Sequence, residues 1–147
     1  MELNTLQALK EIATDVYGEE YPLMIPVSVT QAIHESGFAR REGGSQLAIR
    51  HNNLFGIKAR KGQESVNIPS WEHINGRAVL HTSPFAVFKD YEDCFRFHRK
   101  KMESDRYKSV LEAKTVREAF SELKRCGWAT DTSYPSKLMI IYRAYLV

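Results

Sequence analysis

Glu35, at the end of a predicted helix, is the residue of this sequence best placed to do chemistry. The small residues Ser36 and Gly37 follow it and leave room for a cleft beside its carboxyl group. A carboxylate next to a helix C-terminus is electrostatically disfavoured, so this placement costs stability and points to a function. If it is partly buried, such a carboxyl stays protonated near neutral pH and can protonate the leaving oxygen of a glycosidic bond. Taken alone, a glutamate at a helix end is more often a solvated surface residue.

Two helices are expected to position Glu35. Residues 3–17 carry apolar side chains at helical spacing, and Gly18 beyond them is a typical stop. The second helix begins near Pro26, because proline is favoured in a first helical turn, and it runs to Ser36. Glu35 therefore lies in its last turn, off the apolar stripe that faces the core.

A β-hairpin is predicted in the middle of the sequence. Residues 64–72 and 77–82 have the composition of strands, and Asn75-Gly76 between them favours a tight hairpin turn. The preceding residues, 38–63, are rich in Gly, Arg and Asn, and we expect them to be irregular. The hairpin is thus the single β element in the predicted fold.

The rest of the sequence is expected to be helical. Capping residues indicate three helices: one capped by Asp90 and running to about Ser104, one opened by the capping box of Thr115 and Glu118 and ended by Gly127, and one opened by Thr132 or Ser133. The fold class is therefore mainly α with one small hairpin. Residues 1–147 fit one domain, since domains commonly have about 100–150 residues.

Composition and charge exclude several classes of partner. Hydrophobic residues make up 43%, charged residues 27%, and the net charge is +3. A mild positive balance favours encounter with anionic polymers. The longest basic block is Arg99-Lys100-Lys101, and we find no nucleic-acid-binding motif, signal peptide or membrane-spanning segment. We expect a monomer that neither binds nucleic acid nor inserts into a membrane.

No metal site and no cofactor are expected. Cys94 and Cys126 are too few and too far apart for a zinc site or a disulfide framework. We expect both to be buried free thiols, with a disulfide as the alternative. Ligand spacing is also absent from the five histidines, His34, His51, His73, His81 and His98.

A series of motifs in a fixed order covers roughly residues 22–147. They are Gln31–Gly37, Asn52–Lys58, Ser70–His73 before Asn75-Gly76, Phe88–Tyr91, Arg106-Tyr107, and Gly127–Asp131 with Tyr134 and Leu138. In this order they resemble the glucosaminidase family of bacterial cell-wall hydrolases (glycoside hydrolase family 73), which includes flagellar-rod-associated enzymes and autolysins. The sequence departs from the family pattern at Phe38-Ala39, usually Trp-Gly, at Ser70, commonly Thr, and at Thr132, commonly Pro.

The resemblance implies a lysozyme-like α-helical fold with the hairpin flanking an active-site cleft. It also implies an endo-β-N-acetylglucosaminidase that hydrolyses the β-1,4 bond following N-acetylglucosamine in peptidoglycan glycan strands. Glu35 matches the general acid, and Glu72 matches a hairpin carboxylate that is a candidate base for activating water. In the alternative mechanism the substrate's own N-acetyl group supports the transition state, and Tyr134 positions that group or stabilises the charge.

The same resemblance implies residues that bind the sugar. Asn52 and Asn53 would hydrogen-bond sugar hydroxyls beside the acid, and Phe55 would keep the pocket dry. A purely structural role for this segment is equally open. Trp71 and Trp128 are candidate platforms for sugar rings, with core packing as the alternative.

Two other functions fit the same motifs less well. A lytic transglycosylase shares the fold and the Glu-Ser pair, but it needs no second carboxylate, so Glu72 and the segment Asn52–Lys58 argue against it. A non-catalytic wall-binding or assembly module would have lost turnover, and the presence of Glu35, Glu72 and Tyr134 argues against that.

The sequence suggests three biological settings. Without a Sec signal, a wall hydrolase needs another route to the periplasm or the cell exterior, such as a holin, a phage tail or a secretion machine. We therefore expect a phage lysin or an injected antibacterial effector, and a domain excised from a longer protein is the third possibility. An effector would have a cognate immunity protein, for example one that plugs the cleft.

Overall fold

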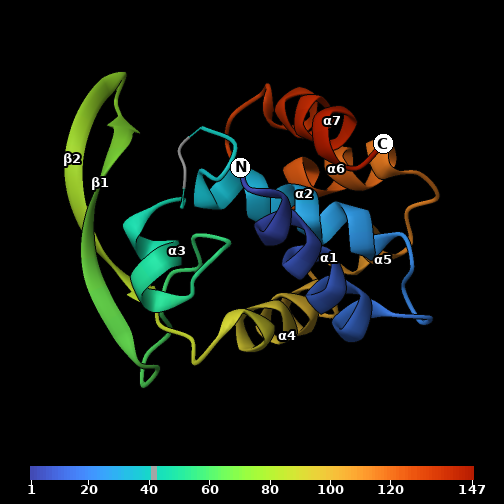
Figure 1. The fold of residues 1–147 in the computed structure, drawn as a ribbon. Coiled ribbons are helices and arrows are strands. Elements are labelled where there is room, and N and C mark those ends of the chain that lie inside the picture. The colour runs from blue at the N-terminus through green and yellow to red at the C-terminus, as the bar shows by residue number, and fades with distance from the viewer. Residues whose placement is uncertain (41–42) are drawn as a thin grey trace.

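Helices make up about half of the residues, and a long two-stranded hairpin lies beside them (Figure 1). The computed structural model describes residues 1–40 and 43–147. The elements in chain order are α1 (Leu3–Tyr17), α2 (Met24–Ser36), α3 (Gln46–His51), β1 (Ser65–Ile74), β2 (Arg77–Ala86), α4 (Tyr91–Met102), α5 (Lys108–Leu111), α6 (Val116–Arg125) and α7 (Tyr134–Tyr145). The mainly α fold with one hairpin is thus confirmed.

Helix α2 lies at the centre of the helical part and packs against α1, α6 and α7. Its apolar residues Val29, Ala32 and Ile33 have no exposed surface, and neither has the polar Gln31. A helix buried on most of its faces is a core helix rather than an amphipathic surface helix. The neighbouring helices therefore hold α2 firmly, and with it Glu35 in its last turn.

Helix α3 corrects the expectation that residues 38–63 are irregular. Ser45 caps it by accepting a hydrogen bond from the Ala48 N–H, and Asn52 ends it in the left-handed conformation with a φ of 56°. Ala48 is the only residue buried among the 6 of this helix. So short an element has no apolar stripe from which the sequence could have revealed it.

The hairpin turns at Asn75-Gly76 as predicted, with φ values of 51° and 76°. Its strands are longer than expected, because pairing continues as far as Ser65 opposite Ala86. In this register Trp71 lies opposite Leu80, and both side chains are more than half exposed. The hairpin therefore presents apolar side chains to solvent.

The predicted caps of α4 and α6 are confirmed. The Asp90 carboxylate accepts from the Asp93 N–H over 2.8 Å, and the Thr115 hydroxyl accepts from the Glu118 N–H over 3.1 Å. The capping box is only half formed, since the Glu118 carboxylate accepts from the N–H of Lys114 instead of Thr115.

The last helix begins at the predicted place, but without the expected side-chain cap. Helix α7 follows Ser133, whose side chain makes no capping hydrogen bond. The Ser133 N–H instead donates to the Asp131 carboxylate over 2.9 Å. The four-residue helix α5 was not predicted, because a single turn leaves no periodicity in the sequence.

Both cysteines are free thiols in this structure. Cys94 is buried, and burial raises the pKa of its thiol to about 12. Cys126 is only partly buried, contrary to expectation, because it caps the C-terminus of α6 near the surface.

Residues 1–40 and 43–147 contain neither a membrane-spanning helix nor a cluster of metal-binding side chains. None of their helices is long and apolar enough to cross a membrane. In the same residues, no cluster of three or more His, Cys, Asp and Glu side chains is arranged to hold a metal ion.

Candidate active site

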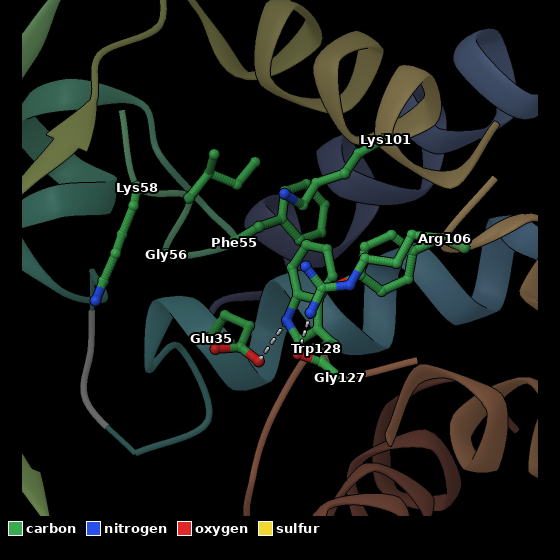
Figure 2. Close-up of a pocket in the computed structure, with 10 residues that line it drawn as sticks. Glu35, Phe55, Gly56, Lys58, Lys101, Arg106, Gly127 and Trp128 are labelled. Carbon is green, nitrogen blue, oxygen red and sulfur yellow. Dashed lines mark hydrogen bonds between the residues drawn. The ribbon is translucent and has the colours of Figure 1, made fainter. Parts of the chain in front are cut away.

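Glu35 lines a cavity of about 300 Å³ beside the end of α2 (Figure 2). Gly37 ends this helix with a φ of 76°, so the chain turns away directly after Glu35 and Ser36. Glu35 is partly buried, and burial raises the pKa of its carboxyl, although hydrogen bonds from Tyr134 and Trp128 oppose the shift. A carboxyl with a raised pKa keeps its proton over the pH range in which a general acid must donate it.

Two donors converge on the same oxygen of Glu35. The Tyr134 hydroxyl donates to Oε1 over 2.9 Å, and the Trp128 indole N–H donates to it over 3.3 Å. An oxygen that accepts from both donors does not carry the proton, so the acidic proton belongs on Oε2. A Cβ added to Gly56 would lie 3.9 Å from Oε2, which places Oε2 on the Gly56 side of the cavity.

Tyr134 is held in turn by a chain of hydrogen bonds through the core. Its oxygen lies 3.0 Å from Gln31 Nε2, and Gln31 Oε1 lies 2.7 Å from His98 Nε2. His98 Nδ1 lies 2.6 Å from the Tyr17 oxygen. The four side chains are at most 2% exposed and come from four helices, α1, α2, α4 and α7. Distant parts of the sequence therefore cooperate in placing one hydroxyl group against Glu35.

One arrangement of protons satisfies every member of this chain. Burial lowers the pKa of His98 to about 3, so the imidazole is neutral. Because the Gln31 amide oxygen can only accept, the His98 proton lies on Nε2, and Nδ1 accepts from Tyr17. The Gln31 amide nitrogen donates to Tyr134, whose own proton then points to Glu35. The chain thus fixes Tyr134 as a donor to Oε1.

Aromatic rings form one wall of the cavity. Phe55 is 1% exposed, and its ring stacks on His98 with the ring centroids 4.1 Å apart. The Trp128 ring packs edge-on against the Phe55 ring with the centroids 6.5 Å apart, and both residues line the cavity. Apolar groups beside Glu35 remove water from its carboxyl, which is the physical cause of the raised pKa.

The two asparagines beside this wall are bonded to the backbone. The Asn53 amide donates to the carbonyls of Ile57 and Ala86 over 2.9 Å each, and its oxygen accepts from the Ile57 N–H. The Asn52 amide donates to the carbonyls of Phe88 and Lys89 over 3.1 Å each. These contacts tie the loop to the foot of the hairpin, which is the structural role that the sequence left open.

The hairpin residues Trp71 and Glu72 line a neighbouring cavity of about 550 Å³. Lys58, Gly127 and Trp128 line both cavities, so the two are adjacent. The Glu72 carboxylate pairs with the Lys58 ammonium over 3.3 Å. The structure therefore places Glu72 at the edge of the Glu35 cavity rather than inside it.

Sequence reasoning assigned no role to Gln31 or His98. A signal was present for His98, because it lies four residues from both Cys94 and Met102 on the buried face of α4. A histidine on an apolar stripe calls for buried hydrogen-bond partners. The sequence does not say which partners these are.

Comparison with known proteins gives the family. A family model, Glucosaminidase, described as mannosyl-glycoprotein endo-beta-N-acetylglucosaminidase, matches residues 13–146. The chain belongs to the glucosaminidase family. The resemblance inferred from the ordered motifs is thereby confirmed.

Two relatives of this glucosaminidase domain are bacterial proteins. It is 29% identical over 133 residues to exo-glucosaminidase LytG of Bacillus subtilis, and this match covers 86% of the chain and 46% of LytG. It is 32% identical over 124 residues to the peptidoglycan hydrolase FlgJ of Pseudomonas aeruginosa, and this match covers 78% of the chain and 30% of FlgJ. The chain thus spans less than half the length of each relative.

Solved structures agree in fold. The catalytic domain of the autolysin Auto from Listeria monocytogenes has a TM-score of 0.76 at 28% identity, with 97% of this chain and 83% of that one covered. A mutant peptidoglycan hydrolase from Sphingomonas sp. A1 has a TM-score of 0.77 at 25% identity, with 96% of both chains covered. The expected lysozyme-like glucosaminidase fold is therefore confirmed.

Proposed function

We propose that this domain is an endo-β-N-acetylglucosaminidase that hydrolyses the β-1,4 bond between N-acetylglucosamine and N-acetylmuramic acid in peptidoglycan. The observation that carries the proposal is the state of Glu35. Its carboxyl group faces a cavity, has a raised pKa, and accepts two hydrogen bonds on Oε1, which leaves Oε2 to carry the proton. Membership of the glucosaminidase family supports the same reaction.

In the proposed reaction Glu35 donates the proton of Oε2 to the leaving oxygen of the glycosidic bond. Negative charge then develops on the Glu35 carboxyl, and the hydrogen bonds from Tyr134 and Trp128 strengthen because they end on that group. Interactions that strengthen in the transition state lower the barrier. We therefore propose that Tyr134 acts through Glu35, by positioning its carboxyl group and stabilising the charge that develops on it.

The second group of the reaction is proposed to be Glu72, acting as the base that activates water. The ion pair with Lys58 supports this assignment, because Lys58 also lines the Glu35 cavity and so ties the hairpin carboxylate to its edge. In the competing mechanism the substrate's own N-acetyl group supports the transition state in place of this carboxylate. The exposed ring of Trp71 next to Glu72 is proposed as a sugar platform.

The proposed bond specificity is tested by digesting purified peptidoglycan, reducing the products with borohydride and identifying the new ends by mass spectrometry. We expect each cut to leave a reducible N-acetylglucosamine end. A muramidase would leave N-acetylmuramic acid ends, and a lytic transglycosylase would leave 1,6-anhydro ends that borohydride does not reduce. Early products of intermediate length distinguish an endo-acting enzyme from an exo-acting one.

The proposed setting is attack on a bacterial wall, either as a phage lysin or as an antibacterial effector with an immunity protein. Expression of the chain with an added periplasmic signal tests the attack, and we expect lysis that Glu35→Gln abolishes. An effector additionally requires that a neighbouring gene product suppress the lysis and bind the chain. No suppression by any neighbour would favour the lysin.

A further inference from the structure

The longest basic block of the sequence sends its three side chains to different surroundings. Arg99 donates to both carboxylate oxygens of Glu20, over 2.9 Å and 2.6 Å. Lys100 is exposed. Lys101 lines the cavity that holds Glu35. One cation of the three therefore belongs to the candidate active site.

Lys101 is accompanied by Arg106. Figure 2 shows the two side chains on one side of the cavity, with Lys58 on the other side. The Lys101 ammonium lies 5.8 Å from the centroid of the Trp128 ring and 5.9 Å from that of the Tyr107 ring. Cation–π contacts of this kind orient a flexible side chain without neutralising its charge.

Arg106 is fixed by the backbone. Its Nε donates to the Cys126 carbonyl over 2.9 Å, and its Nη2 donates to the Gly127 carbonyl over 3.2 Å. Gly127 makes the approach possible, because a Cβ at this position would lie 2.6 Å from Nη2 of Arg106. The guanidinium is therefore held in place by two carbonyl groups, which carry no net charge.

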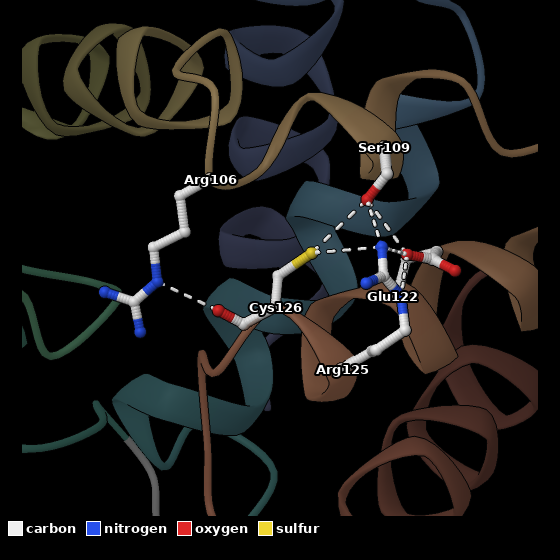
Figure 3. A network of polar contacts seen from close by, with 5 residues as sticks. All are labelled: Arg106, Ser109, Glu122, Arg125 and Cys126. Carbon is white, nitrogen blue, oxygen red and sulfur yellow. Dashed lines mark hydrogen bonds and ion pairs between the residues drawn. The ribbon is translucent and has the colours of Figure 1, made fainter.

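The segment that supplies these carbonyls is itself anchored (Figure 3). Glu122 in α6 accepts from the Ser109 hydroxyl of α5 over 2.9 Å and from Arg125 Nε over 2.7 Å. The Ser109 oxygen also lies 3.3 Å from the Cys126 sulfur. This network joins α5 to the end of α6, so it steadies the carbonyl that orients Arg106.

Lys101 and Arg106, the two cations of this wall, form no ion pair with a carboxylate in residues 1–40 and 43–147. Both lie over the Tyr107 ring, with the Lys101 ammonium 5.9 Å and the Arg106 guanidinium carbon 5.2 Å from its centroid. Burial, and then the charges of Arg60 and Arg106, lower the pKa of Lys101. Like charges held together in this way repel each other, and a bound anion relieves the repulsion.

We propose that Lys101 and Arg106 form a subsite for a carboxylate group carried by the substrate. The proposal rests on the proposed function, because a peptidoglycan strand carries such groups whereas a neutral N-acetylglucosamine polymer does not. Two sources have the same chemistry: the free lactyl carboxylate of a strand without peptides, and the carboxylates of the stem peptides. The subsite would make the glucosaminidase prefer wall strands over neutral strands with the same β-1,4 backbone.

The test compares three preparations of the same strands: with stem peptides, stripped by an amidase so that lactyl carboxylates are free, and stripped with these carboxylates capped as methylamides. The first variant, Lys101→Met, removes the positive charge and keeps most of the aliphatic part of the side chain. The second, Arg106→Lys, keeps the positive charge and loses the planar guanidinium with its several N–H donors. Lys100→Met is the matched control, with the same change one residue earlier on the exposed side. The readout is kcat/KM together with the Kd of the strands on a Glu35→Gln background.

We expect Lys101→Met to lower kcat/KM about tenfold, mainly through KM, on strands that present the carboxylate. The expected effect of Arg106→Lys is smaller and in the same direction. Capped strands should be bound equally by all variants, and Lys100→Met should behave as wild type throughout. If Lys101→Met lowers kcat/KM only on the stripped strands, the group bound is the lactyl carboxylate. If it lowers kcat/KM only on the peptide-bearing strands, the group bound is a carboxylate of the stem peptide.

Equal losses on capped and uncapped strands would overturn the subsite, and so would wild-type behaviour of Lys101→Met on all three preparations. The outcome is separable from that of the proposed function. Hydrolysis of capped strands with N-acetylglucosamine ends supports the function whatever Lys101 does. Strand binding to the Glu35→Gln protein reports on the carboxylate even if the wild type cuts a different bond.

Discussion

The phenolic oxygen of Tyr134 lies 2.9 Å from Oε1 of Glu35 and joins the first turn of α7 to the last turn of α2. The contact assigns different tasks to the two oxygens of one carboxyl group. Oε1 accepts from Tyr134 and Trp128, whereas Oε2, on the Gly56 side of the cavity, is left to carry the proton.

Replacing Glu35 with Gln keeps the shape of the side chain and removes the transferable proton. We expect wall lysis to fall at least about 10²–10⁴-fold, the usual contribution of a general acid. Turbidity of a wall suspension and released reducing ends measure the loss. Unchanged activity in a folded Glu35→Gln protein would contradict the assignment of the acid.

The same substitution has a predictable effect on stability. Folding raises the pKa of Glu35, so the stability it contributes is fully present below the ordinary value near 4.5 and is lost as pH rises through the raised pKa. Glu35→Gln has no such titration. Its melting temperature relative to wild type should therefore increase from pH 4 to pH 8, as measured by thermal denaturation. A difference that shrinks with rising pH would mean that the folded pKa is lowered instead.

The buried chain behind Tyr134 is tested by Gln31→Met, alone and combined with Tyr134→Phe. Gln31→Met removes the donor that orients the Tyr134 hydroxyl, so kcat should fall by about five- to tenfold, as expected for one hydrogen bond. Because a hydrogen bond from Tyr134 lowers the pKa of Glu35, weakening it should move the alkaline limb of the pH profile upward.

Non-additivity separates positioning from general destabilisation in this cycle. If Gln31 acts through Tyr134, Gln31→Met should cause no further loss of kcat in the Tyr134→Phe protein. Tyr17→Phe is the control, since it removes the hydrogen bond at the far end of the chain. This control should lower the melting temperature and leave the pH profile in place. Fully additive losses would argue for a structural role alone.

Glu72 distinguishes the two mechanisms. If Glu72 activates water, Glu72→Gln should lose nearly as much activity as Glu35→Gln, and azide should partly rescue Glu72→Ala. If the substrate's N-acetyl group instead supports the transition state, the loss should be modest and comparable to that of Tyr134→Phe. Kinetics on soluble strands with and without azide measure the outcome. A Glu72→Gln enzyme with the wild-type rate would remove Glu72 from the mechanism.

Local patterns in the sequence were enough for the main elements of the fold. The end of α1 was marked by Gly18, and the beginnings of α4 and α6 were marked by Asp90 and Thr115. The hairpin turn was marked by Asn75-Gly76. Such signals are local because caps and turns depend on the backbone geometry of a few adjacent residues. Single-turn helices such as α5 were not predicted, since they are too short to show a helical repeat of apolar residues. The motifs around Glu35 also gave the family, because they lie in continuous stretches of sequence.

What the sequence by itself determined was the helix end that presents Glu35 and the family to which the chain belongs. Only the tertiary structure decided that His98 and Gln31 stand behind Tyr134, as the hydrogen-bonded partners are separated by 67 and 103 residues. The same holds for Lys101, which faces the cavity while its neighbour Lys100 faces solvent. Contacts of this kind depend on how helices pack against one another, and no local pattern encodes which side chains then meet.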